Sequence, residues 1–165
     1  MSYFSDVRDW HRAAGIPLAD RPARLDSGRK HLRLDLMDEE WWEFRVEAYK
    51  QRDLAEVAKE AADLIVTVLG TMAEMGIPFD AVWAAVHASN MTKIGPDGAV
   101  RMRPDGKILK PEGWQAPDIG AIITLNPEEA PPAEVEWTGA DEGEWLRRMD
   151  GYGIDTSECT FGGAL

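Results

Sequence analysis

Acidic residues recur at intervals of three and four in two segments of the chain. They are Glu39, Glu40, Glu43 and Glu47 in the first segment, and Glu56, Glu60 and Asp63 in the second. Like charges at these spacings destabilise a helix by about 0.2–0.5 kcal/mol per pair. Water and cations can relieve that repulsion, because Lys50 can reach Glu47 and Lys59 can reach Glu56. A bound divalent cation is the alternative explanation.

Carboxylate oxygens are the ligands that hard cations such as Mg²⁺ prefer. Two facing helices that each offer acids one turn apart can build such a site inside a helical bundle. No second helix of this chain offers histidines at a matching spacing. The pattern therefore favours Mg²⁺, or Mn²⁺, over Zn²⁺.

Apolar periodicity predicts an all-α fold, a helical bundle of about four main helices with a small hairpin or flap. The helices are expected over residues 3–14, about 27–51, 53–75 and 79–91, with Ser2 or Ser5 capping the first and Asp53 the third. The turn pairs Asp97-Gly98 and Asp105-Gly106 predict the small β-hairpin or extended flap.

The acidic face of the second expected helix is predicted to contact another helix. Following that face toward the N-terminus leads to Leu36 and Leu32, so an acidic surface continues as an apolar one. A face turned wholly to solvent would not need this continuation. The acids at 39–47 should therefore lie opposite a neighbouring helix, and the third helix carries the matching acids.

Composition excludes several classes of protein. The chain has 165 residues, a net charge of −12 and one cysteine, Cys159, so no internal disulfide can form. The first residues do not show a basic start followed by an apolar run, so we expect no signal peptide. No apolar stretch is long enough for a membrane span. The acidic balance argues against nucleic-acid binding. A cytoplasmic location is expected.

The charge is unevenly distributed and predicts two parts. Residues 120–165 carry 10 acids and 2 bases, a net charge of −8, together with several prolines and glycines. We therefore expect a helical domain over 1–119 and an irregular acidic extension over 120–165. The extension is either a solvated tail or a strap that packs its aromatic residues on the body or on a partner subunit.

Several motifs together resemble a known family. They are Glu39-Glu40-x-x-Glu43 followed by Glu60-x-x-Asp63, the element Ser89-Asn90-Met91-Thr92-Lys93, and the segment over 105–118. This combination resembles the all-α nucleoside triphosphate pyrophosphohydrolases, the MazG-like and phosphoribosyl-ATP pyrophosphohydrolase-like superfamily. The resemblance covers roughly residues 5–119.

The resemblance implies an activity and assigns roles to residues. Members cleave nucleotides between the α- and β-phosphates to give a monophosphate and pyrophosphate. By this likeness the ligands of Mg²⁺ would be Glu40, Glu43, Glu60 and Asp63. Glu39 would orient or deprotonate the attacking water, although spacing leaves open which of Glu39 and Glu40 is base and which is ligand. Asn90 and Lys93 would bind the phosphates.

We therefore expect a Mg²⁺-dependent nucleoside triphosphate pyrophosphohydrolase that assembles as a homodimer or homotetramer. House-cleaning of non-standard or pyrimidine nucleotides such as dUTP or dCTP is the first hypothesis. Hydrolysis of phosphoribosyl-ATP and a non-catalytic helical module that binds partners through its acidic face are the alternatives. Outside the acidic motif, His11 is expected to be packed in the core, and the basic residues over 101–110 form either a solvated hairpin or a lid over phosphates.

Overall fold

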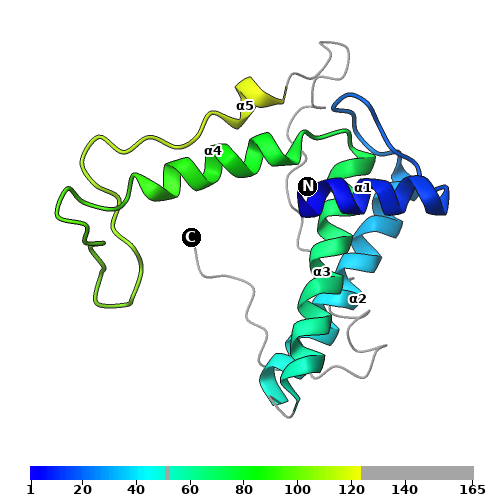
Figure 1. Cartoon of the computed structure of the whole chain (residues 1–165), viewed down its shortest axis with the longest axis horizontal. Helices are drawn as coiled ribbons and strands as arrows, with labels where there is room; N and C mark the ends of the chain where they lie inside the picture. The colour runs from blue at the N-terminus through cyan, green and yellow to red at the C-terminus, as the bar shows by residue number, and fades with distance from the viewer. Residues whose placement is uncertain (51–52, 124–165) are drawn as a thin grey trace. The chain divides into compact units, whose positions relative to one another are not determined.

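The computed structural model describes residues 1–50 and 53–123, and it is helical (Figure 1). Its helices are α1 (Tyr3–Ala14), α2 (Ser27–Lys50), α3 (Leu54–Glu74), α4 (Phe79–Met91) and α5 (Ile119–Ile122). The prediction of an all-α chain with four main helices is confirmed. The short α5 spans the predicted boundary at 119/120, and the extension from residue 124 onward lies outside the described residues.

The ends of α1 and α3 are fixed by the residues that the sequence offered as caps. Ser2 and Ser5 form a capping box at α1, each side chain bonding the other's backbone, so both candidate caps take part. Gly15 ends α1 in the left-handed conformation with φ 69°. Asp53 caps α3 by accepting a hydrogen bond from the amide of Ala55 at 2.8 Å.

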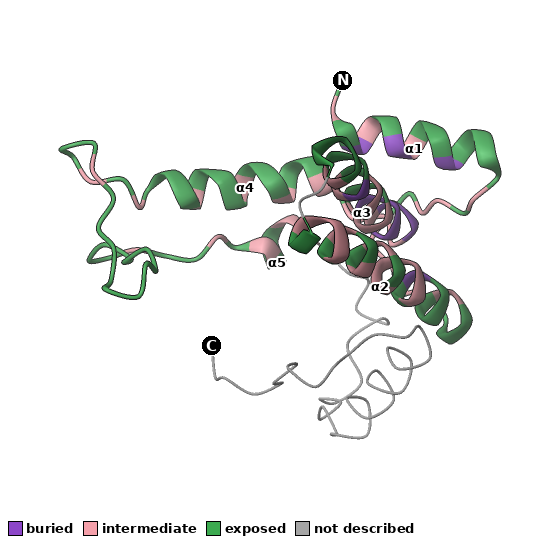
Figure 2. Ribbon diagram, turned by 90° about the horizontal axis from the view of Figure 1, so that it is seen from below, coloured by how far each residue is buried: buried purple, intermediate pink, exposed green. Residues whose placement is uncertain are grey.

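The apolar core lies between α1 and α3. Its buried members are Phe4, Val7, Leu69 and Ala73, with Leu18, Met72 and Phe79 packed against them. The buried positions of the described chain gather on these two helices and on the inner side of α2 (Figure 2). The core therefore holds the C-terminal half of α3 and leaves its N-terminal half, which carries the acids, against α2 alone.

The segment between α1 and α2 closes the C-terminal end of α3. The amides of Ala19 and Ala23 donate to the carbonyls of Ala73 and Met75 at 3.3 and 2.9 Å, and so satisfy acceptors that a helix end leaves open. Gly76 follows with φ 64°, and a Cβ there would lie 2.1 Å from the backbone oxygen of Arg21. Only glycine fits this crossing.

The acidic face of α2 packs against α3, as the sequence predicted. Toward the N-terminus, however, this face continues through Met37 and Arg33, and the expected continuation through Leu32 is wrong. Arg33 is buried at 5% exposure, whereas Leu32 is 44% exposed. The inner stripe follows steps of three and four from Glu40 to Met37 and Arg33, a path about 100° away from the one through Leu36.

Helix α4 leaves α3 at a bend of 117° and has no buried residue. Beyond it, the predicted hairpin is reduced to two isolated antiparallel bridges, Ile94 to Val100 and Met102 to Ile108, each around one of the two turn pairs. Among the described helices, none is by itself long and apolar enough to cross a bilayer, although the bent pair of α3 and α4 meets that length and composition when taken together.

Candidate metal centre

Three carboxylates from two helices converge. Glu40 of α2 and Glu60 and Asp63 of α3 each offer an oxygen, and these oxygens all lie within 4.8 Å of one another. Helices α2 and α3 run antiparallel, and Glu40 on α2 lies beside the turn of α3 that carries Glu60 and Asp63. Oxygen donors at this separation suit a hard divalent cation.

Burial makes this cluster electrostatically costly. Glu60 is only 7% exposed, and its Oε2 has no hydrogen-bond partner within the described part of the chain. Partial desolvation and the neighbouring Asp63 carboxylate raise the pKa of Glu40 above its ordinary value. Desolvation and Glu60 likewise raise the pKa of Glu43, which lines a hollow together with Glu60 but is not one of the three residues whose oxygens converge within 4.8 Å. An unpaired oxygen among repelling carboxylates is the condition that a cation relieves.

Lys59 is in direct contact with this cluster. Its Nζ lies 2.9 Å from Glu60 Oε1 and 3.0 Å from Asp63 Oδ2. These two hydrogen bonds raise the pKa of Lys59, so the ammonium stays charged at neutral pH. The sequence had suggested Glu56 as its partner, one turn in the other direction.

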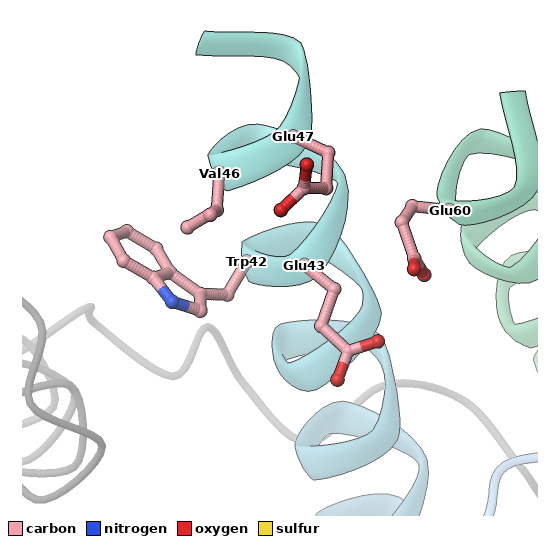
Figure 3. A pocket seen from close by; sticks show the side chains of 5 residues that line it. All are labelled: Trp42, Glu43, Val46, Glu47 and Glu60. Carbon is pink, nitrogen blue, oxygen red and sulfur yellow. The ribbon is translucent and has the colours of Figure 1, made fainter. Parts of the chain in front are cut away.

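An open hollow of about 300 Å³ adjoins the cluster and is lined by Trp42, Glu43, Val46, Glu47 and Glu60. In Figure 3 the Glu43 carboxylate lies on the side of α2 that faces Glu60, the Glu47 carboxylate folds back over α2, and Trp42 and Val46 extend from the opposite side of α2. The hollow therefore combines an acidic wall with an aromatic edge. Such a combination suits a ligand that carries both a charged and a flat apolar part.

The remaining predicted residues are placed differently. Glu39 is an exposed residue of α2, next to Glu40 in sequence. Lys93 donates to Asn90 Oδ1 at 2.8 Å and lies 5.5 Å from the ring of Trp114. The contacts of Asn90 and Lys93 thus belong to the end of α4 and to the segment that follows it, and α4 extends to the side of α2 and α3 (Figure 1). The roles assigned to all these residues remain predictions.

A second polar cluster, which the sequence did not predict, lies between the same helices. At the opposite end of the α2–α3 contact, Arg29 donates to Glu74 Oε2 at 2.8 Å through Nε and at 2.5 Å through Nη2. Arg33 donates to Thr71 Oγ1 at 3.0 Å and to the carbonyl of Thr67 at 2.6 Å. Extending the stripe Glu60, Asp63, Thr67 by further steps of four and three gives Thr71 and Glu74, and this periodicity could have identified the cluster.

His11 joins this cluster from α1. It is 2% exposed, as the prediction of a packed histidine requires, and burial and the adjacent Arg33 lower its pKa. Gly70 makes the close approach feasible, because a Cβ at that position would lie 2.5 Å from His11 Nε2 and 2.6 Å from Arg33 Nη2. Three helices therefore meet at a buried polar junction.

Comparison with protein families identifies a relationship that covers most of this helical region. A sequence model described as phosphoribosyl-ATP pyrophosphohydrolase matches residues 7–90. The matched range begins within α1 and ends within α4, and it includes every carboxylate of the cluster. Comparison with curated proteins gave no match.

Proposed function

The chain belongs to the phosphoribosyl-ATP pyrophosphohydrolase family, within the all-α nucleoside triphosphate pyrophosphohydrolase superfamily, and we propose that it is a Mg²⁺-dependent nucleotide pyrophosphohydrolase. The observation that carries this proposal is the convergence of Glu40, Glu60 and Asp63 within 4.8 Å on two facing helices. An acidic face used only to bind partners would not need a nearly buried glutamate with an unpaired oxygen.

The residues of the cluster fit a divalent cation. Glu40, Glu60 and Asp63 supply hard oxygen donors, and Glu43, which lines the hollow together with Glu60, would be a fourth. When bound, Mg²⁺ supplies the positive charge that lets a polyphosphate approach an acidic surface and that favours deprotonation of water. Mn²⁺ has similar ligand preferences and would be a substitute.

The protein's own residues would orient the reactants. In the proposed reaction, Glu39 accepts a proton from the water that attacks the α-phosphate. The bond between the α-phosphorus and the bridging oxygen breaks, and pyrophosphate leaves. Lys93 and Asn90 would hold phosphate oxygens by a charge-assisted hydrogen bond and by an amide hydrogen bond.

We propose that Asn90 and Lys93 act on a neighbouring copy of the chain. Helix α4 has an exposed apolar surface, with Trp83 64% exposed and Val86 38% exposed, and a second copy would bury this surface. In a mixed oligomer, Glu60→Gln subunits and Lys93→Met subunits should then restore part of the activity that each variant lacks alone. Activity that is no higher in the mixture than in the separate variants would place both residues in one chain.

The substrate class has two candidates. Cleavage of deoxynucleoside triphosphates such as dUTP and dCTP, as a house-cleaning activity, is the first, and the aromatic edge formed by Trp42 beside the acids offers a surface for a base. Hydrolysis of phosphoribosyl-ATP is the second, and the description of the matching family favours it. Both reactions release pyrophosphate. A cytoplasmic location without membrane or nucleic-acid partners remains a prediction.

A panel assay tests the proposal. Pyrophosphate release is measured for the canonical ribo- and deoxynucleoside triphosphates, dUTP and phosphoribosyl-ATP, with Mg²⁺ and with EDTA. We expect turnover with Mg²⁺ alone, and its loss in Glu60→Gln at unchanged helical content by circular dichroism. A Glu112→Gln variant, outside the helices, is the matched control. Full turnover by Glu60→Gln would refute the assignment, and no turnover on any substrate would favour the non-catalytic module.

A further inference from the structure

Lys59 stands where a cation would bridge two of the proposed ligands. Its Nζ contacts Glu60 Oε1 at 2.9 Å and Asp63 Oδ2 at 3.0 Å, so a single ammonium bridges two carboxylates that lie one turn apart on α3. Mg²⁺ binds carboxylate oxygens at about 2.0–2.1 Å. A divalent ion held by Glu60 and Asp63 would therefore lie close to the Lys59 ammonium, and the two positive charges would repel each other.

The Lys59 contact is not explained by ordinary stabilisation of α3. Lysine placed four residues before an acid has the less favourable of the two orientations for a helical ion pair. The Lys59 side chain is 57% exposed, so the stem lies in solvent and can rotate away without opening the core. Glu60, by contrast, is held between the helices and keeps one oxygen unpaired in the described region.

We propose that Lys59 is a tethered counter-cation of the carboxylate cluster. Its ammonium neutralises the carboxylates when no metal is bound, and it moves away from them when a divalent ion binds. This inference rests on the proposed function, because it takes the cluster to be a metal site. Lys59 is thus a positioning residue that sets the affinity for the metal. It lowers that affinity, and it reduces the repulsion among the carboxylates when no metal is bound. The cation that competes with Mg²⁺ is supplied by the chain itself.

The test is a titration of the full-length, EDTA-stripped protein with MgCl₂ by isothermal calorimetry, together with thermal unfolding at zero and saturating Mg²⁺. Lys59→Met removes the charge and keeps a helix-forming side chain of similar length. Lys59→Arg keeps the charge. Lys30→Met, an exposed position near the other end of α2, makes the same change in net charge away from the cluster.

We expect Lys59→Met to bind Mg²⁺ roughly threefold to tenfold more tightly than the wild type. Its metal-free form should unfold at a lower temperature, so that Mg²⁺ raises its unfolding temperature by more than it raises that of the wild type. Lys59→Arg and Lys30→Met should bind like the wild type. Binding by Lys59→Met but not by the wild type would also support the proposal.

Two other results would overturn it, and they can be told apart. If the wild type, Lys30→Met and Lys59→Met all bind Mg²⁺ equally, or if Lys59→Met binds more weakly, Lys59 does not compete, and the metal site of the proposed function stands. If none of these proteins binds Mg²⁺ or is stabilised by it, the metal site and the role of Lys59 both fail.

Discussion

Replacing Glu74 by glutamine isolates the energetic contribution of the buried polar junction. The Glu74 side chain is fully buried and faces two guanidinium groups, with Arg29 Nη2 2.5 Å from Oε2 and Arg33 Nη1 3.5 Å from Oε1. Glutamine keeps the size of the side chain and an acceptor oxygen but removes the charge. Arg33, with a side chain 6% exposed, would then be a buried cation without its anion.

The expected magnitude follows from the burial of the three groups. Removing one partner of a buried ion pair costs about 3–5 kcal/mol. The Arg29 side chain is 31% exposed and can turn toward water, so we expect the lower end of that range. With a urea slope of about 2 kcal/mol/M, the unfolding midpoint should fall by roughly 1.5 M.

Urea unfolding followed by circular dichroism measures this change. Asp9→Asn is the matched control, because Asp9 and Arg12 form an ion pair on α1 whose side chains are 74% and 61% exposed. Such a pair contributes about 0–1 kcal/mol. If Glu74→Gln shifts the midpoint no more than Asp9→Asn does, the junction does not stabilise the fold and the electrostatic reasoning is wrong.

Three further predictions concern other parts of the structure. Gly70→Ala should destabilise the protein by about 1–3 kcal/mol in thermal unfolding, because its Cβ would lie 2.5 Å from Nε2 of the buried His11. Gly28→Ala should cost less, because its Cβ would lie 3.3 Å from the carboxylate of the exposed Asp26, which can move. Since burial and Arg33 lower the pKa of His11, the unfolded chain takes up the proton first; unfolding free energy should fall as pH drops from about 7.5 toward 5, and His11→Gln should flatten that slope in urea titrations. Trp114→Ala should speed tryptic cleavage within 95–113, because the indole N–H donates to a carbonyl of α4 at 3.3 Å, and an unchanged digestion rate would contradict this.

Much of the fold followed from local signals. The apolar spacing of three and four located α1 to α4. Ser2 and Asp53 cap the N-termini of α1 and α3, where capping chemistry predicts. The meeting of Glu40 with Glu60 and Asp63 followed from matching acid spacings on two helices. These features depend on residues close in sequence, or on one repeated interval.

The rest depended on three-dimensional context. Arg33 was overlooked because an arginine is rarely buried without an anion, and its partner Glu74 lies 41 residues further along the chain. Leu32 was expected inside because it is apolar, but hydrophobicity alone does not say which stripe of α2 faces α3. Lys59 had Glu56 within reach in one direction along α3 and Glu60 and Asp63 in the other, and only the rotamer adopted in the fold selects Glu60 and Asp63 over Glu56.

The two polar clusters on α2 and α3 also fix how far one helix can slide along the other. Arg29 pairs with Glu74 at one end, and Glu40 meets Asp63 at the other, eleven residues or about 16 Å along α2. A displacement of one helical turn, about 5.4 Å, would separate both pairs at once. An apolar seam would tolerate such a shift more readily, because its contacts are interchangeable. The Arg29–Glu74 contact thus fixes the register of the carboxylates on the two helices, and the spacing of the oxygens in the proposed metal site depends on a contact outside that site.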